Sequence, residues 1–415
     1  MTVPALRTVP FLNCGKDCST CRRQSRSVCV ASFACKTWEV KTKFLRRMSR
    51  GYSAKCEKPV FFGESVEPKK ATQNTKILIL EFIRFIYEVK KMSEKIYDSL
   101  TQLIGKTPLV RLHGFEKLHG LKAHILAKVE YFNPIGSIKD RIVLCIIEDA
   151  EKEGKISPEK TTLIEYTSGN TGIAVSAIGA MKGYKVKIYL QDGTSQERFD
   201  IMKAFGADVT RISNVPEIQE ALKTTNNDFV AATNILKQHI RDCQAAGENI
   251  YFVDQMLNPL NAAAHHDTTG REIWEDTEGN LSAVVASVGT AGTIRGISDY
   301  VKEKNPQVQI VAVEPSADDK FLTRIHNFTD VPAERVPVNI REKIYDEVFV
   351  ADKDGAFVAV QEVAKTDGVL VGISSGAALW GVLQIASRPE YEGKNIVIVL
   401  PDTGFRYLST DLFKS

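Results

Sequence analysis

The chain is predicted to adopt an α/β fold in which helices cover both faces of parallel sheets. Three observations support this prediction. Short runs rich in β-branched residues alternate with longer amphipathic stretches after about residue 92. Polar, glycine-containing motifs fall at the expected strand-to-helix turns, where α/β sheets place ligands. The length of 415 residues exceeds what one compact core accommodates, which predicts two domains and an appended segment.

The expected strands share a short apolar run of Val, Ile and Leu, which is typical of strands buried on both faces. They are Thr162 to Tyr166, Val186 to Leu190, Val284 to Ser287, Ile310 to Glu314 and Ile396 to Leu400. The stretches between them carry apolar residues at helical spacing. The expected helices are Thr171 to Lys182, Gln196 to Phe205 and Thr293 to Lys304. This alternation indicates parallel sheets rather than an all-helical or all-strand protein.

Charge and cysteine content change at about residue 91. Residues 1–91 contain 19 Lys/Arg and 7 Asp/Glu, whereas the rest contains 35 and 44, although the whole chain has a net charge of only +3. The acidic body argues against a nucleic-acid groove. Only Cys145 and Cys243 fall in the body. Two widely spaced thiols do not make a disulfide framework, so a reducing compartment such as the cytoplasm is expected.

Membrane and metal binding are not expected in the body. No apolar run reaches the roughly 18 residues that a membrane span needs. His265 and His266 form the most obvious candidate metal pair, but they have no acid or cysteine partner at ligand spacing. We therefore interpret these histidines as structural.

Residues 1–91 form a basic, cysteine-containing extension that we expect to lie outside the fold. In one interpretation, translation begins at Met92. In a second, the Arg-rich, acid-poor residues 1–56 are an organelle transit peptide, which would direct the protein to a mitochondrion or plastid. In a third, Cys14, Cys18 and Cys21 bind a metal or an iron–sulfur cluster. No second ligand pair accompanies that triad, so the first two interpretations are favoured.

A lysine within the run Asn133 to Arg141 is the first candidate for chemistry. Lys139 offers an amine that can condense with an aldehyde once burial lowers its pKa. After a substrate displaces it, the same amine is suited to removing an α-proton. The alternative is a surface lysine beside Asp140 and Arg141. Two motifs further along the chain favour the chemical role.

The first of these motifs is Thr167 to Gly172, where a helix is expected to begin. Its backbone N–H groups, helix dipole and hydroxyls suit an α-carboxylate, and glycine permits close approach. The candidate substrate-binding residues in this run are Thr167, Ser168, Gly169 and Thr171. A helix cap is the alternative interpretation, and capping and binding are compatible.

The second motif follows the expected strand ending at Ser287 and precedes an expected helix. Successive N–H groups and two threonine hydroxyls there can surround a phosphate without a lysine. The candidate phosphate-binding residues are Gly289, Thr290, Ala291, Gly292 and Thr293. By itself this motif is weak, because small-residue turns occur in most α/β proteins.

Taken together, Lys139 and the two motifs resemble the fold-type II pyridoxal-phosphate (PLP) enzymes, and within them the cysteine synthase and cystathionine β-synthase family. The resemblance extends from about Ile96 to Leu412. It implies a tryptophan synthase β-like fold of two open, twisted parallel-sheet domains with PLP in the cleft. A smaller, mobile domain would span 136–243, and 92–135 would join 244–415 in the larger, cofactor-binding domain.

The resemblance also implies roles for individual residues. Lys139 would hold the cofactor as a Schiff base, and Asn170 would contact its ring hydroxyl. Gln255 would join the loop that binds the substrate carboxylate. Ser374, in Gly372 to Gly376, matches the position that faces the pyridine nitrogen. A hydroxyl there leaves that nitrogen largely neutral, which suits β-elimination of a good leaving group better than transamination.

The implied activity is that of a cysteine synthase, in which O-acetylserine and sulfide give L-cysteine and acetate, and the implied assembly is a homodimer. Three other hypotheses stay open. A sister enzyme could use homocysteine, thiosulfate or O-phosphoserine, and a cysteine lyase could release sulfide. A regulatory protein could retain the fold without catalysis and bind a partner, although the intact Lys139 argues against this.

Three departures from the family pattern bear on specificity. Tyr166 replaces a proline before the carboxylate loop, which suggests an altered substrate preference. Ala291 replaces a glycine in the phosphate loop, where a methyl group is tolerated if the backbone needs no positive φ. The stretch His326 to Ile340 differs from the glycine-rich loop of A-type cysteine synthases and is closer to the B type. Both the sulfur donor and the family's partner, serine acetyltransferase, are therefore open.

Overall fold

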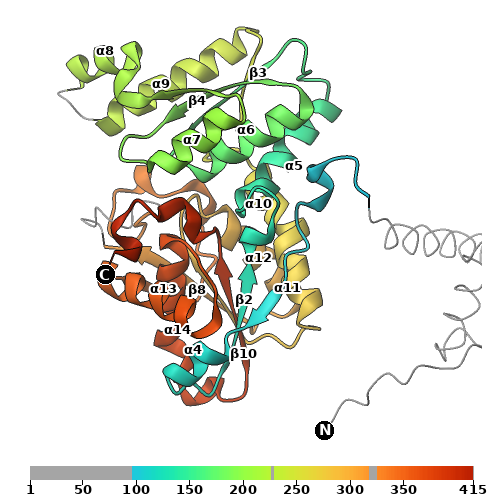
Figure 1. Ribbon diagram of the computed structural model, residues 1–415, viewed down its shortest axis with the longest axis vertical. Helices are drawn as coiled ribbons and strands as arrows, with labels where there is room; N and C mark the ends of the chain where they lie inside the picture. Colours follow the sequence, from blue (N-terminus) through green and yellow to red (C-terminus); the bar gives the residue numbers. More distant parts are fainter. Residues whose placement is uncertain (1–95, 226–228, 317–324, 415) are drawn as a thin grey trace, which may run out of the picture. The chain divides into compact units, whose positions relative to one another are not determined.

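The computed structural model describes residues 96–225, 229–316 and 325–414 of the chain (Figure 1). The predictions for residues 1–91 lie outside the described residues. The described segments belong to one unit of the chain, Glu94–Ser415. They form two sheets, each with helices on both faces, as the alternation of strands and helices predicts.

The larger sheet has six strands in the order β1-β2-β10-β7-β8-β9. Their bounds are β1 Leu109–Arg111, β2 His124–Val129, β7 Ala283–Ser287, β8 Gln309–Pro315, β9 Glu347–Ala351 and β10 Asn395–Leu400. β1 pairs with β2 in antiparallel fashion, and the other pairs are parallel. The central strands β7 and β10 are almost wholly apolar and buried, because helices cover both faces of the sheet.

The smaller sheet has four parallel strands in the order β5-β4-β3-β6. Their bounds are β3 Thr162–Thr167, β4 Lys185–Leu190, β5 Asp208–Arg211 and β6 Ile250–Phe252. β6 lies beyond residue 243, where the smaller domain was predicted to end. The sheet continues past that position because the chain returns through α9 (Phe229–Ala245) and pairs an apolar run with β3. The division into two domains itself stays a prediction.

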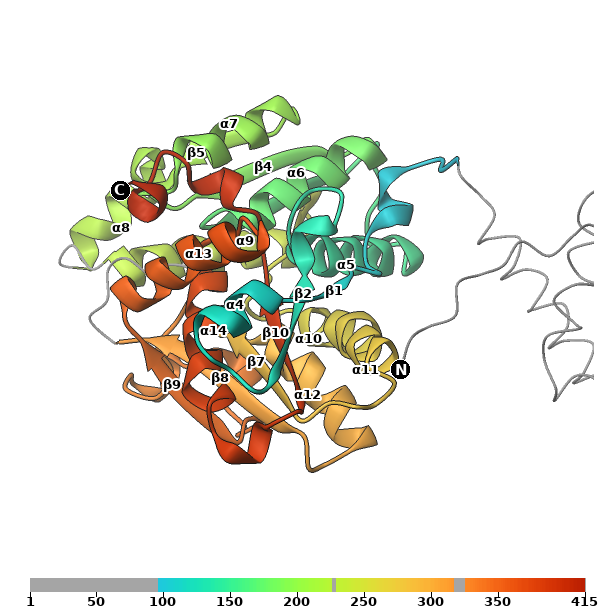
Figure 2. The ribbon, with the colours of Figure 1, turned by 60° about the horizontal axis from the view of Figure 1, so that its bottom comes forward.

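The larger sheet lies between two groups of helices (Figures 1 and 2). One group is α4 His113–Leu118, α13 Lys353–Asp367 and α14 Ile373–Ala386. The other is α10 Leu260–Ala264, α11 Arg271–Asp276 and α12 Gly292–Lys304, with a π-helical turn at His265–Gly270. α13 and α14 pack unusually closely, because a Cβ on Gly376 would lie only 2.3 Å from the carbonyl oxygen of Ala356. Only glycine fits at this crossing.

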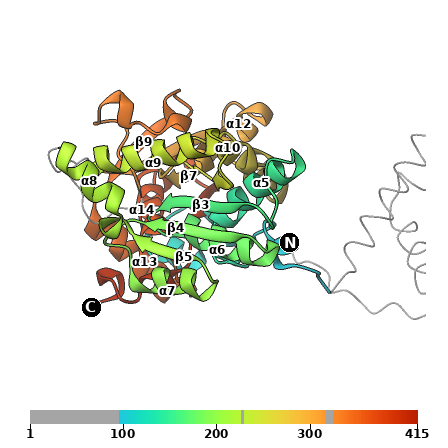
Figure 3. The ribbon, with the colours of Figure 1, turned by 90° about the horizontal axis from the view of Figure 1, so that it is seen from above.

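The smaller sheet is covered in the same way, as the view from above shows (Figure 3). α5 Lys139–Lys152, α6 Asn170–Lys182 and α7 Gln196–Ala204 contribute to one apolar cluster. α8 Pro216–Thr224 and α9 contribute to a second cluster on the opposite face. Among the helices that the structure describes, none is both long and apolar enough to span a membrane.

Candidate active site

A pocket opens where the carboxyl ends of strands from both sheets meet. Its lining includes Thr167 at the end of β3, Gln191 after β4, Ser287 at the end of β7 and Pro401 after β10. The loops that lead from each parallel strand into the next helix lie at this edge, which is why α/β proteins bind ligands there. The cavity holds about 290 Å³, close to the lower end of the range for small-molecule sites.

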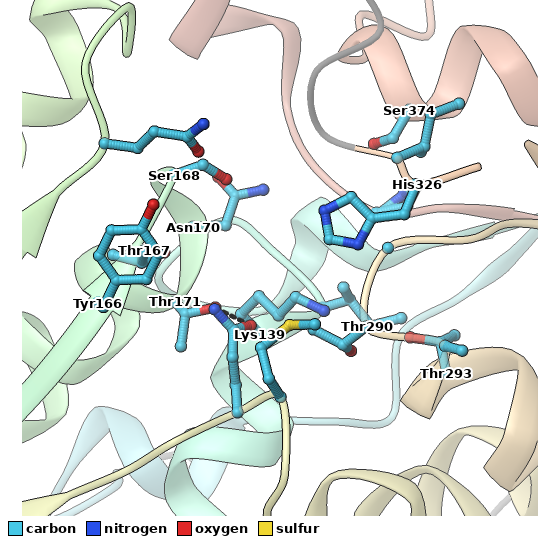
Figure 4. Close-up of a pocket in the computed structure, with 18 of the residues that line it drawn as sticks. Lys139, Tyr166, Thr167, Ser168, Asn170, Thr171, Thr290, Thr293, His326 and Ser374 are labelled. Carbon is cyan, nitrogen blue, oxygen red and sulfur yellow. Dashed lines mark hydrogen bonds between the residues drawn. The ribbon is translucent and has the colours of Figure 1, made fainter. Parts of the chain in front are cut away.

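Lys139 is the first residue of α5, and its side chain extends between the two sides of the pocket (Figure 4). Burial lowers the pKa of Lys139 to about 8, and the nearby carboxylate of Asp402 opposes this lowering. Among the described residues, no hydrogen bond or ion pair engages the Lys139 amine. A substantial fraction of this amine is therefore neutral near physiological pH and free to act as a nucleophile.

The two charged neighbours of Lys139 in sequence do not reach solvent; both are buried. Asp140 Oδ2 accepts a hydrogen bond of 2.9 Å from the backbone N–H of Ile135, which closes the loop that precedes the helix. Arg141 donates from Nε to Glu130 Oε2 at 2.8 Å and from Nη2 to Glu272 Oε2 at 2.7 Å. These anchors fix the start of α5 and hence the position of Lys139.

The loop after β3 approaches Lys139 from the smaller sheet (Figure 4). Gly169 has φ 149°, a conformation that non-glycine residues rarely adopt, and its N–H donates to Thr167 Oγ1 at 3.0 Å. Thr171 Oγ1 donates to Gln255 Oε1 at 2.6 Å, so two candidate carboxylate ligands from distant parts of the chain adjoin. Ser168 also lines the pocket, whereas Gly169 shapes the turn without lining it.

Asn170 begins α6 and lines the same side of the pocket. Its Nδ2 donates to Asp402 Oδ2, and its Oδ1 accepts from Arg406 Nη1, both at 2.7 Å. Asp402 is buried and also accepts a hydrogen bond from the Tyr407 hydroxyl. Because one partner donates and the other accepts, the orientation of the Asn170 amide is fixed.

The candidate phosphate loop lies at the amino end of α12, on the larger sheet. Thr290 Oγ1 accepts from Asn261 Nδ2 at 2.8 Å, and Thr293 Oγ1 hydrogen-bonds to His265 Nε2 at 3.1 Å. A Cβ on Gly292 would lie 2.0 Å from Asn261 Oδ1, so only glycine fits there. Gly289 lines the pocket, whereas Gly292 lies behind the lining.

Ala291 does not meet the condition under which a methyl group was expected to be harmless. Its φ is 61°, in the left-handed region where a Cβ is unfavourable. Glycine would adopt this conformation at lower cost. The phosphate loop therefore carries local backbone strain.

Ser374, near the start of α14, lines the pocket opposite the carboxylate loop (Figure 4). His326 lies on the same side, and burial lowers its pKa below the usual 6.5. The pocket thus contains every predicted site residue except Gly169 and Gly292, which form turns behind it. The roles of these residues stay predictions.

Several residues at the pocket were not singled out from the sequence as site residues. The α9 residues among them are Thr233, Asn234 and Lys237. Nothing local distinguishes this Lys237 from other lysines, because its position depends on how α9 packs against β3. His265 was interpreted as structural. The fold places it beneath the phosphate loop, where its Nε2 hydrogen-bonds to Thr293 Oγ1.

The lining suits PLP. Within the described part of the chain the lining contains no Asp or Glu side chain that would repel a phosphate or a carboxylate. The Lys139 amine, which has no hydrogen-bond partner among the described residues, lies between a helix amino end that can hold the phosphate and a hydroxyl-rich loop. Gly289 to Thr293 would hold the phosphate, and Lys139 the aldehyde carbon.

The match to a family model agrees with this site. Residues 100–402 match the model described as pyridoxal-phosphate dependent enzyme. The chain belongs to this family. This class accounts for both the paired α/β sheets and the isolated lysine between two anion-binding loops.

Similarity to individual proteins narrows the class to its cysteine synthase branch. The chain is 38% identical over 327 residues to a cysteine synthase of Staphylococcus aureus, covering 78% of this chain and 99% of that protein. It is 38% identical over 314 residues to cysteine synthase 3 of Caenorhabditis elegans, covering 75% and 88%. Among solved structures, O-acetyl serine sulfhydrylase isoform 3 from Entamoeba histolytica matches with a TM-score of 0.65 and 37% identity, covering 78% of this chain and 93% of that one.

Proposed function

We propose that the protein is a cysteine synthase, which converts O-acetylserine and sulfide to L-cysteine and acetate with PLP as cofactor. The observation that carries this proposal is the position of Lys139. Its amine, with a pKa of about 8, lies between the Thr171–Gln255 pair and the phosphate loop. The similarity to cysteine synthases and to an O-acetyl serine sulfhydrylase supports the choice of substrates.

In this proposal each element has a separate task. The loop from Thr167 to Thr171 and the Gln255 amide bind the α-carboxylate and orient Cα. Bound PLP supplies the electron sink that makes the Cα proton acidic. The Lys139 amine, freed when the amino-acid substrate takes its place, accepts that proton.

The chemistry then passes to Cβ. Acetate leaves with the electron pair of the Cβ–O bond, sulfide forms the new Cβ–S bond, and Lys139 returns the proton to Cα. Ser374 faces the site with a neutral hydroxyl, which favours this elimination over transamination. Asn170, held by Asp402 and Arg406, presents its amide to the ring hydroxyl of the cofactor.

The test is a visible spectrum of the full-length holoprotein. An absorption band of lysine-bound PLP should change when O-acetylserine is added and recover when sulfide is added, with stoichiometric cysteine. Lys139→Ala should lack the band and lose activity by several orders of magnitude, whereas the exposed Lys365→Ala should behave as wild type. Circular dichroism checks that both variants fold. A wild-type band that ignores O-acetylserine would contradict the proposal.

We also propose a homodimer. Large apolar side chains are exposed on the segment before β1 and on the turn after β2: Tyr97 is 50% exposed, Leu100 51% and Phe132 59%. The two segments adjoin, since the Gly105 N–H donates to Asn133 Oδ1 at 2.8 Å. Such a surface suits a subunit interface. Analytical ultracentrifugation tests it: Phe132→Glu should shift a dimer towards monomer.

The predicted smaller domain, 136–243, would move to close the pocket. Solution scattering with and without substrate would test this movement.

A cytoplasmic location is proposed on the described cysteines, Cys145 and Cys243, which are both free thiols as in reducing compartments. Fluorescence microscopy of the tagged full-length chain in its source cells would test it; an organelle pattern would favour the transit-peptide interpretation.

A further inference from the structure

One side of the pocket is built by residues that have no role in holding the cofactor or the α-carboxylate. They come from the end of β3, the end of β4 and the middle of α9. They are Tyr166, Gln191, Thr233, Asn234 and Lys237. Tyr166 lies at the edge of the carboxylate loop (Figure 4). This side of the pocket would therefore lie next to the bound amino acid, beyond its α-carboxylate.

Lys237 is the charged member of the group. Its Nζ lies 4.5 Å from the centroid of the Tyr166 ring. Burial lowers the pKa of Lys237, which means that its surroundings do not fully compensate its charge. Tyr166 in turn is hydrogen-bonded to the side chain of Thr233, and burial raises the Tyr166 pKa to about 12, so the phenol stays a hydrogen-bond donor.

The acidic groups near Lys237, Glu165 and Asp254, raise its pKa, but by less than burial lowers it. Burial raises the pKa of Glu165 well above its usual value, which opposes ionisation of this carboxyl. Asp254 is paired with Arg241, whose Nε lies 2.7 Å from its Oδ2. In the segments that the structure describes, no carboxylate lies within ion-pair distance of the Lys237 ammonium.

The charges in the pocket lining exceed what the proposed cofactor and substrate use. The basic side chains that line it are Lys139, Lys237 and His326. Its described lining contains no acidic side chain. The phosphate has its own loop, and the α-carboxylate has Thr171 and Gln255. Lys139 is already assigned to the cofactor. Lys237 is then left without an assigned anion.

We propose that Lys237, together with Tyr166 and Thr233, binds an oxyanion carried beyond Cβ, either on the leaving group of the amino acid or on the sulfur nucleophile. This inference rests on the proposed function and specifies its substrate class. With O-phosphoserine and sulfide, the Cβ–O bond breaks, phosphate leaves with its electron pair, and Cβ–S forms. With O-acetylserine and thiosulfate, acetate leaves and the terminal sulfur of thiosulfate attacks Cβ, giving S-sulfocysteine.

The experiment compares three substrate pairs on the full-length holoenzyme: O-acetylserine with sulfide, O-phosphoserine with sulfide, and O-acetylserine with thiosulfate. Lys237→Gln keeps length and polarity but removes the charge. It should leave kcat/KM for the first pair within about twofold and lower kcat/KM for an anionic pair at least tenfold. Tyr166→Phe should lower the same anionic pair by a smaller factor. Lys203→Gln, which removes an exposed cation on α7, should change none of them.

The pair that is affected identifies the source of the oxyanion. A loss confined to O-phosphoserine assigns Lys237 to the leaving group, and a loss confined to thiosulfate assigns it to the nucleophile. Equal loss in all pairs, no loss in any pair, or a wild type that neither turns over nor binds either anionic substrate would overturn the proposal.

A second readout separates this proposal from the proposed function. Thiosulfate binding to the holoprotein is measured by calorimetry, which needs no turnover, and O-phosphoserine binding by the change in the PLP spectrum. If O-acetylserine and sulfide yield no cysteine, the function fails while the subsite is still decided by these titrations. Binding of either anion that weakens at least tenfold in Lys237→Gln supports the subsite; binding of neither anion, or binding unaffected by the substitution, contradicts it.

Discussion

Asn170 Nδ2 donates a 2.7 Å hydrogen bond to Asp402 Oδ2, although 232 residues separate the two positions. Asp402 also lies near Lys139, whose pKa it raises against the effect of burial. One buried carboxylate thus fixes the Asn170 amide and tunes the Lys139 amine. The contact joins the first turn of α6 to the segment after β10, so it depends on how the two sheets meet.

The first prediction concerns this tuning. Asp402→Asn removes the charge that raises the pKa of Lys139, so that pKa should fall further below about 8. Because only the neutral amine condenses with an aldehyde, the rate of PLP uptake by the apoprotein should reach half its plateau at a lower pH than in wild type. Stopped-flow absorbance measures this midpoint. Asp411→Asn, at an exposed position, is the control; an unchanged or higher midpoint in Asp402→Asn would refute the assignment.

The second prediction concerns the strained residue of the phosphate loop. Ala291→Gly should stabilise the protein by about 1 kcal/mol, because glycine adopts the left-handed conformation without a Cβ clash. Urea unfolding of the apoprotein measures the change. Ala262→Gly, within α10, should instead destabilise by about 1 kcal/mol. Similar destabilisation by both substitutions would show that the φ of 61° at Ala291 has no energetic cost.

The third prediction concerns the support of that loop. His265 is fully buried and bridges Thr269 Oγ1, 2.9 Å from Nδ1, to Thr293 Oγ1, 3.1 Å from Nε2. His265→Phe leaves both hydroxyls without this partner, and should cost about 1–3 kcal/mol of stability and weaken PLP binding. Titration of apoprotein with PLP measures the affinity. Thr269→Val is the control that should affect stability more than affinity; unchanged affinity in His265→Phe would argue against a role in positioning Thr293.

The fourth prediction is a pH dependence. Burial alone would raise the pKa of Glu272, but hydrogen bonds and charge from Arg141 outweigh it and lower this pKa to about 2, from the usual 4.5. A carboxyl with a lowered folded-state pKa contributes stability that is fully present above about pH 4.5 and is lost as pH falls towards 2. Glu272→Gln should therefore destabilise strongly at pH 7, by about 3–5 kcal/mol.

The loss of stability caused by Glu272→Gln should be smaller in acid. The difference between wild type and Glu272→Gln should shrink by about 1.4 kcal/mol per pH unit below pH 4.5. Urea unfolding at pH 7, 4.5 and 3.5 measures it, and the exposed Glu390→Gln provides the baseline. A difference that stays constant across these values would mean that Glu272 is not ionised in the fold.

Much of the fold follows from local sequence. The strands expected at Val284 to Ser287 and Ile396 to Leu400 agree with β7 and β10 within one residue at each end. Long β-branched runs bounded by turns have few alternatives to a buried strand. The short β6 was not expected, because three residues carry too little pattern to be distinguished from a loop. It forms only because β3 offers it a partner.

Within the site, local sequence was enough to predict those groups that act together with their immediate neighbours in the chain. Lys139, the loop at Thr167 and the loop at Gly289 are each a short run in which residue type and spacing restrict what the backbone can bind. Their order along the chain was enough to indicate a PLP enzyme, and the family match confirms that class.

The surroundings of those groups depend on how distant segments pack together. Lys237 reaches the pocket because α9 packs over one face of the smaller sheet. Asp402 reaches Asn170 because the carboxyl ends of strands from both sheets converge on the pocket. Ala291 adopts a positive φ, although its residue type disfavours that conformation. Burial, pKa and backbone strain arise from contacts between segments far apart in sequence, and no local pattern encodes them.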